Sequence, residues 1–541
     1  MSRHLPVHAA LAHAVRDQGT DTLYGLMGDA NLFLVDHYVR ACAGRYVPAV
    51  HEAGAVLMAL GHASVTGGVG VATITQGPAV SNATTALIEG VKGKLPIVLL
   101  AGDTPEADPD HLQAVAQQPI IEATGAGFQH LGSPDTAVRD LTTAFDRARA
   151  ERRPIVLNMP SPFMWEQTEY AGVQDPEAVH ATDPVEGTAL DDAIGILAAA
   201  RAPLILAGRG AIHAKDSLTT LADRIGAPVA TTLKAKALFD GARYDLGVFG
   251  TLSTPAASDV IGAADCVVAF GASLNRFSTA HGGLLSGKRL VQVDDDVRQL
   301  GRYQAADAAL AGDPAAVADT FVHWLDAAEI PSSQFTDTID ADALRAPLPT
   351  LKLAHEPGTL NYFDALDRID RALPADRIFV TDGGRFMTEA WCRIGVSQPL
   401  NFVQSVHVGA IGMGMGYAIG ASIARPAQQT LFLCGDGGFM MGGLAEFATA
   451  VRERLNMVTV ICNDSAYGAE YVQFEDRQID PALSTFAWPS FAAMADAMGA
   501  TGLRATNTDE LQAALEVATV TQGPVLVELI LDPAAMPRMH L

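Results

Sequence analysis

Short apolar runs rich in valine, isoleucine and leucine alternate with longer alanine-rich stretches along almost the whole chain. The clearest runs are residues 69–74, 154–157, 203–206, 265–270, 289–293, 377–380, 431–434, 457–462 and 524–531. A strand of a parallel sheet is buried on both faces, so it reads as a continuous apolar run, and its alternation with helices is typical of βαβ units. The chain is therefore predicted to be an α/β protein built on doubly wound parallel sheets.

The length of 541 residues predicts about three domains, since one domain usually takes about 100–200 residues. Two stretches have the composition of linkers. One is polar and covers about 166–183, and the other covers about 336–358 and contains Pro347, Pro349 and Pro357. They divide the chain into predicted domains at residues 1–170, 184–335 and 358–541.

The first and third of these segments echo each other. An offset of 360 residues places Gly77 on Gly437, superposes 71–74 on 431–434, and places 95–100 on 455–460 without a gap. Strand, glycine turn, alanine-rich helix and strand recur in the same order, although few residues are identical. This repetition predicts two α/β domains of similar fold.

The chain is strongly acidic, with 36 Lys and Arg against 61 Asp and Glu and a net charge of −25. This balance argues against nucleic acid and anionic membranes as partners, because phosphate backbones are bound by basic surfaces. An anionic ligand must instead be held by local groups such as glycine amides, a helix N-terminus or a bound cation.

Five cysteines are scattered through the chain without a C-x-x-C pair: Cys42, Cys266, Cys392, Cys434 and Cys462. An odd number at wide spacing predicts reduced thiols in a cytoplasmic protein, not a disulfide framework or a zinc site. We also expect neither a secretory signal nor a membrane span, because the N-terminus lacks an apolar signal core and the apolar runs are only of strand length.

The most informative motif is Gly435-Asp436-Gly437-Gly438, which directly follows an apolar run and precedes a helical stretch. Glycines there let backbone amides approach a phosphate, and the helix N-terminus favours negative charge. Asn463 follows Asp436 by 27 residues, at the end of the next predicted strand. Neighbouring parallel strands would bring both side chains to one hard cation such as Mg²⁺. The alternative is a helix-capping aspartate in a tight turn, since short motifs match often by chance.

Two other segments are weaker signals when taken alone. The glycine-rich stretch 409–416 fits close helix packing or a dinucleotide turn, but no clear strand precedes it. His51-Glu52-Ala53-Gly54 opens an alanine-rich helix, where a glutamate in the first turn is favourable for the helix dipole alone.

The order of these segments is more specific than any one of them. Glu52 comes first, then Gly77-Pro78 with Asn82, then the stretch 409–416, and then Asp436 with Asn463. In this order the chain resembles the thiamine-diphosphate-dependent enzymes of the acetohydroxyacid synthase, pyruvate decarboxylase and benzoylformate decarboxylase group. The resemblance covers nearly the whole chain. It implies a pyrimidine-binding N-terminal domain, a central domain and a diphosphate-binding C-terminal domain, with thiamine diphosphate and Mg²⁺ as cofactors.

The resemblance also implies residue roles. Mg²⁺ would be bound by Asp436, Asn463 and the carbonyl of Ser465, and the diphosphate by the amides of Gly437 and Gly438. Glu52 would bind the aminopyrimidine ring and favour its imino tautomer. Ile411 would support the bent cofactor from below, while the Gly409 carbonyl and the Ile411 amide bind the pyrimidine edge. Further positions implied in the cofactor site or at the reacting centre are Asn82, Gln113, Ala469 and Glu470.

Several positions depart from the pattern of acetohydroxyacid synthases. Glu470 replaces a valine, and no tryptophan follows it in the stretch that selects the acceptor. It coincides with a glutamate that pyruvate decarboxylases place near the bound intermediate, or it is simply an exposed helix N-terminal residue. The paired histidines of pyruvate decarboxylases are absent from the first domain, where His51, His62 and His130 stand apart. Arg385 follows two glycines and either contacts the diphosphate or is a surface arginine.

The resemblance implies cleavage or formation of a C–C bond next to a carbonyl. The leading interpretation is acetolactate-synthase-like: a 2-keto acid loses CO₂ and is joined to a second carbonyl compound. A simple 2-keto acid decarboxylase is the runner-up, and a 2-hydroxyacyl-CoA lyase comes third. In some relatives the middle domain binds FAD or a CoA nucleotide, and in others it binds neither. For this chain, FAD, a CoA nucleotide and an empty middle domain all stay open. Because the family shares its sites between subunits, we expect a homodimer at least, and a homotetramer as the usual assembly.

Overall fold

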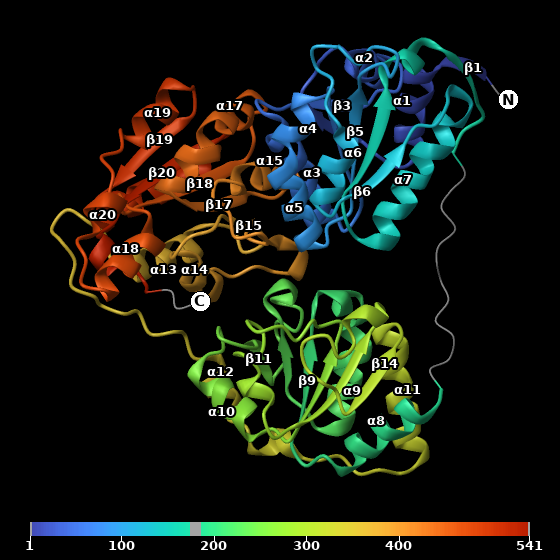
Figure 1. The fold of residues 1–541 in the computed structure, drawn as a ribbon. Coiled ribbons are helices and arrows are strands. Elements are labelled where there is room, and N and C mark those ends of the chain that lie inside the picture. Colours follow the sequence, from blue (N-terminus) through green and yellow to red (C-terminus); the bar gives the residue numbers. More distant parts are fainter. Residues whose placement is uncertain (1–2, 174–185, 539–541) are drawn as a thin grey trace. The chain divides into compact units, whose positions relative to one another are not determined.

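The computed structural model describes residues 3–173 and 186–538 (Figure 1). Three six-stranded parallel sheets follow one another along the chain, each covered by helices. Figure 1 colours the first domain blue to cyan, the second green to yellow and the third orange to red. The predicted α/β class is therefore confirmed.

The first and third sheets have the same topology. The first has the order β3-β2-β4-β5-β7-β6 and the third has the order β16-β15-β17-β18-β20-β19. The strands of the first are β2 (Thr22–Gly25), β3 (Arg45–Pro48), β4 (Gly70–Ile74), β5 (Ile97–Asp103), β6 (Gly127–His130) and β7 (Ile155–Pro160). Those of the third are β15 (Ile378–Thr381), β16 (Phe402–Gln404), β17 (Thr430–Gly435), β18 (Met457–Asn463), β19 (Thr501–Ala505) and β20 (Val525–Ile530). The offset of 360 carries β5 onto β18 residue for residue, so the echo in the sequence reflects a repeated fold.

The middle sheet is wound differently, in the order β11-β10-β9-β12-β13-β14. Counted along the chain this is 3-2-1-4-5-6, the order of dinucleotide-binding folds. Its strands are β9 (Pro203–Ala207), β10 (Val229–Thr231), β11 (Asp245–Val248), β12 (Cys266–Phe270), β13 (Arg289–Asp294) and β14 (Ala308–Ala311). Its main covering helices are α8 (Thr188–Ala199), α9 (Lys215–Ile225), α10 (Pro255–Ala263) and α11 (Pro314–Ala327).

The first and third sheets belong to one compact unit, and the middle sheet forms another. The second unit also takes in Trp391–Phe402 from the third segment of the sequence. Lys236 of the second unit binds this segment, because its ammonium group donates to the carbonyl oxygen of Ile394 at 2.6 Å. Part of the first predicted linker, residues 174–183, lies outside the described residues. The second predicted linker contains the short helices η7 (Phe335–Thr338) and α12 (Ala341–Arg345).

Two helices join the first and third sheets into one core. They are α3 (Glu52–Thr66) and α15 (Gly414–Ala424), and they cross at positions where only glycine leaves room. A Cβ at Gly61 would lie 2.2 Å from the carbonyl oxygen of Tyr417, and one at Gly420 would lie 1.9 Å from that of Met58. Both distances are far below van der Waals contact, so the close approach depends on glycine. Within the described residues no helix is long and apolar enough to cross a bilayer.

Candidate active site

The carboxyl edge of the third sheet gathers the polar residues of the predicted metal site. Strands β17 and β18 are neighbours, with Gly435 opposite Cys462, so the residues that follow them meet at one edge. Asp436 begins the short helix α16 (Asp436–Gly438), which continues through a π-helical turn (Phe439–Gly443) into α17 (Leu444–Arg452). The side chain of Asp436 is buried; one carboxylate oxygen accepts from the Gly437 amide at 2.7 Å and the other from the Trp488 indole at 3.0 Å.

Asn463 is fixed from both sides. Its Oδ1 accepts from the amide and the hydroxyl of Ser465, both at 3.2 Å, and its Nδ2 donates to Glu528 at 2.9 Å. Ser465 adopts a left-handed backbone conformation with φ 55°. Its carbonyl oxygen accepts from the Phe486 amide at 2.8 Å, which uses one of the two lone pairs. The structure thus brings Asp436, Asn463 and Ser465 together.

A buried ion pair joins Arg385 to Asp464, the residue between Asn463 and Ser465. Arg385 donates from Nη2 to Asp464 at 2.6 Å and from Nε at 3.0 Å. Both side chains are buried, which rules out the surface arginine that the sequence left open. Any contact of Arg385 with a diphosphate would fall to its remaining terminal nitrogen. Burial, followed by the nearby charge of Asp464, raises the pKa of Asp436 above its ordinary value.

The loop 409–412 packs against the π-helical turn Phe439–Gly443 that follows α16. Gly409 and Gly412 have φ values of 79° and 85°, which favour glycine. The Gly412 amide donates to the buried Asp382 at 2.7 Å, and a Cβ at Gly442 would lie 2.2 Å from the Gly412 carbonyl oxygen. Burial raises the pKa of Asp382 to about 6. Gly409 is exposed and Ile411 is half-buried, so both are open to a ligand.

In the first domain, Glu52 is the first residue of α3. One of its carboxylate oxygens accepts from Asn82 at 3.0 Å, so two of the predicted cofactor residues lie together. Gln113 accepts from the side chain of Gln76 at 2.8 Å, and its carbonyl oxygen lies so close to Gly77 that a Cβ there would be 2.1 Å away.

Carboxylates of the two domains hold each other's loops. Glu446, on α17, is buried and accepts from the amides of Val50 and His51 at 2.6 and 3.0 Å, directly before Glu52. Glu89, on α5 (Thr84–Gly93), is equally buried. It accepts from the amides of His407 and Val408 at 3.0 and 2.7 Å, directly before Gly409. Each predicted cofactor-binding segment is thus positioned by the other domain.

Two predicted positions stand apart from these groups. Ala469 and Glu470 lie in the first turn of α18 (Gly468–Asp476), and both are exposed. Their roles remain predictions.

Comparison with known proteins shows the family of the chain. Three models of thiamine pyrophosphate enzymes match in sequence order: the N-terminal TPP-binding domain at residues 6–124, the central domain at 190–321 and the C-terminal TPP-binding domain at 382–529. The chain belongs to the thiamine pyrophosphate enzymes.

Several curated proteins are similar to this thiamine pyrophosphate enzyme along nearly their full length. A sulfoacetaldehyde acetyltransferase of Castellaniella defragrans is 28% identical, over 93% of this chain and 89% of its own. The large subunit of acetolactate synthase isozyme 2 of Escherichia coli is 27% identical, over 96% and 95%. A "probable 2-ketoarginine decarboxylase" of Pseudomonas aeruginosa is 28% identical, over 96% and 93%.

The residues of this thiamine pyrophosphate enzyme fit a cation and a diphosphate. Asp436 and Asp464 are two buried carboxylates opposed by one guanidinium, which leaves a net negative charge for a cation to neutralise. Carboxylate, amide and backbone oxygens are the ligands that Mg²⁺ prefers. Gly438 permits the close approach of Asp382, since a Cβ there would lie 2.9 Å from a carboxylate oxygen of that residue.

Some supporting residues escaped the sequence analysis. Glu528 is a single charge inside the apolar strand β20, a signal that could have been noticed. Asp382 follows β15 just as Asp436 follows β17, which is also visible in the sequence. Nothing in the sequence marks Trp488 or Glu446 as partners of the site, because both contacts join segments far apart in the chain.

Proposed function

We propose that this enzyme uses thiamine diphosphate and Mg²⁺ to decarboxylate a 2-keto acid and then joins the product to a second carbonyl compound. The observation that carries the proposal is the cluster of Asp436, Asn463 and Ser465 at the carboxyl edge of a domain that matches the TPP-binding model. The similarity to an acetolactate synthase supports the ligation step.

Asp436, Asn463 and the Ser465 carbonyl would hold Mg²⁺, and the amides of Gly437 and Gly438 would face the diphosphate. Glu528 would orient Asn463, because it fixes the amide nitrogen and so directs the oxygen the other way. Cation and glycine amides, not a basic surface, allow this acidic protein to hold a diphosphate.

When bound, the cofactor supplies an electron sink next to the substrate carbonyl, which permits C–C bond cleavage and formation. Glu52 would hold a proton at a ring nitrogen of the aminopyrimidine. Asn82 fixes the Glu52 carboxylate at 3.0 Å and so positions that proton. Ile411 would set the bend of the cofactor, and Gly409 would accept from the pyrimidine edge.

We further infer a homodimer as the smallest active unit, with Glu52 from one subunit and the Mg²⁺ site from the other, and a homotetramer as the usual assembly. The family resemblance supports this arrangement. None of the five cysteines, all of which lie in the described residues, forms a disulfide, which supports the predicted cytoplasmic location.

A second candidate is a simple decarboxylase that releases an aldehyde. The exposed Glu470 at the predicted reacting centre and the similarity to a 2-ketoarginine decarboxylase favour it.

The test supplies purified enzyme with thiamine diphosphate, Mg²⁺ and a panel of 2-keto acids, with and without aldehyde acceptors, and identifies the products by mass. A ligated hydroxyketone or hydroxyketo acid is expected. Aldehyde alone would replace the ligase by the decarboxylase, and absence of CO₂ from every acid would overturn both. The absorption spectrum of the same preparation shows whether the middle domain carries FAD.

A further inference from the structure

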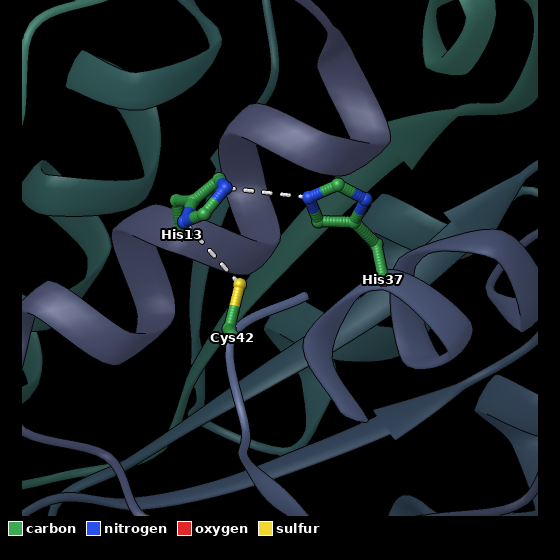
Figure 2. A group of neighbouring side chains, drawn as sticks. All are labelled: His13, His37 and Cys42. Carbon is green, nitrogen blue, oxygen red and sulfur yellow. Dashed lines mark hydrogen bonds between the residues drawn. The ribbon is translucent and has the colours of Figure 1, made fainter. Parts of the chain in front are cut away.

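A group of metal-ligating side chains lies in the first domain, away from Glu52. His13 is on α1 (Val7–Asp17), His37 is on α2 (Leu32–Arg40), and Cys42 follows α2. Figure 2 shows the two imidazoles and the thiol facing one another. Within β5, Val98 and Leu100 face the core beneath α1 and α2, whereas Leu99 faces the core that contains α3. Successive residues of a strand point to opposite faces, so the cluster and Glu52 lie on opposite sides of the sheet.

The distances suit one small cation. His13 Nε2 lies 3.3 Å from His37 Nε2, and His13 Nδ1 lies 3.3 Å from the sulfur of Cys42. One donor atom from each residue can be chosen so that all three lie within 4.8 Å of one another. A tetrahedral zinc ion, with bonds of about 2.0 Å to nitrogen and 2.3 Å to sulfur, separates its donor atoms by about 3.3–3.6 Å. Only one nitrogen of His13 can bind the ion, so binding would draw donor atoms that now lie within 4.8 Å of one another to these separations.

The backbone holds two of the donors in place. The carbonyl oxygen of His37 accepts from the amides of both Ala41 and Cys42, at 2.9 and 3.2 Å, which closes the end of α2. Ala43 then takes a left-handed conformation with φ 52°, which turns the chain away. His37 and Cys42 are thereby fixed on one side of His13.

The surroundings keep the imidazoles ready to coordinate. Burial lowers the pKa of His13 and of His37, which favours the neutral imidazoles that ligate a metal. Burial raises the pKa of the Cys42 thiol, so a metal must displace its proton to solvent. Asp17, one turn beyond His13, adds negative charge, and Arg3 opposes it. Asp17 itself accepts from the hydroxyl of Tyr170.

We propose that His13, His37 and Cys42 bind one zinc ion through two imidazoles and a thiolate, with water as the fourth ligand. An open pocket of about 250 Å³, lined by Arg3, His13, Asp17 and Tyr170, gives solvent access to the His13 side of the cluster. Two nitrogen donors and a sulfur donor select zinc over the hard Mg²⁺ of the active site. The ion would tie α1 to the end of α2. The scattered cysteines alone predict no zinc site, because the two histidines join Cys42 only through the fold.

The test uses Co²⁺ as a spectroscopic probe of the full-length protein. Metal-free protein is first saturated with Mg²⁺ and thiamine diphosphate to fill the oxygen-ligand site, and then titrated with Co²⁺. We expect one equivalent bound with a thiolate-to-cobalt charge-transfer band, which oxygen ligands do not give, and displacement of the cobalt by Zn²⁺. Zn²⁺ should also raise the midpoint of thermal unfolding.

Cys42→Ser should abolish the band, and His37→Gln should weaken cobalt binding at least tenfold. Cys392→Ser, at another half-buried cysteine, should change neither. Circular dichroism of the metal-free variants checks their folding, and each of the two variants is informative without the other. No thiolate band in the unmodified protein, or a band that survives Cys42→Ser, would overturn the proposal.

Discussion

The first and third domains differ from the middle domain in more than strand order. The two outer sheets have the same topology and share one core through α3 and α15. A buried glutamate of each outer domain accepts hydrogen bonds from a loop of the other. The middle sheet has its own winding and its own cores. All the predicted cofactor and metal residues lie on the outer pair. The difference indicates that the predicted cofactor-binding segments are positioned by contacts between the two similar domains, whereas the middle domain contributes none of the predicted cofactor residues.

The largest expected effect is the loss of Asp436. Asp436→Ala removes a buried carboxylate from the Mg²⁺ site and should lower CO₂ release about 1,000-fold or more, since a catalytic metal is worth several kcal/mol. The matched control is Asp319→Ala, an exposed aspartate on α11 of the middle domain, which should keep full activity. Equal activity of the two variants would refute the division between outer and middle domains.

Glu52→Gln tests the other half of the pair. A neutral amide cannot exchange a proton with the pyrimidine, so the rate should fall about 100- to 1,000-fold, while calorimetry still detects cofactor binding. Mixing inactive Glu52→Gln and Asp436→Ala subunits should restore part of the activity, because mixed dimers contain one intact site. Absence of recovery after verified subunit exchange would exclude a site shared between subunits.

The glycine contacts between the outer domains can be broken directly. Gly420→Ala places a methyl group on the Met58 carbonyl and should destabilise the protein by about 1–3 kcal/mol. Its control is Gly262→Ala on α10 of the middle domain, where a Cβ meets nothing within 4 Å; this change should be neutral or stabilising by about 0.5–1 kcal/mol. Thermal unfolding of both variants compares them, and an unchanged midpoint for Gly420→Ala would show that the crossing of α3 and α15 is not tight.

The smallest effect concerns the support of Asn463. Glu528→Gln removes the charge that holds the Asn463 amide and should weaken Mg²⁺ binding about tenfold. Glu516→Gln, at an exposed site on α20 (Thr508–Val520), should leave it unchanged. Titration of Mg²⁺ against enzyme activity measures both constants. An unaltered constant for Glu528→Gln would make this glutamate a purely structural residue.

Much of this could be predicted from the sequence, for clear reasons. Buried parallel strands are continuous apolar runs, so the α/β class was visible, and the offset of 360 anticipated the repeated topology. Asp436 and Asn463 stand at strand ends, whose convergence follows from parallel pairing. The partners Glu446, Glu89 and Trp488 were not predictable, because side-chain contacts between distant segments leave no local pattern. For the same reason, the sequence does not predict that Trp391–Phe402 packs with the unit that contains the middle sheet.

The most direct test of the central claim is a calorimetric titration of metal-free enzyme with thiamine diphosphate, with and without added Mg²⁺. The claim is that the carboxyl edge of the third sheet binds the cofactor through Mg²⁺. We predict tight binding with Mg²⁺, loss of binding with a chelator or in Asp436→Ala, and retained binding in Glu52→Gln. Binding that persists unchanged without Mg²⁺ or in Asp436→Ala would contradict the account.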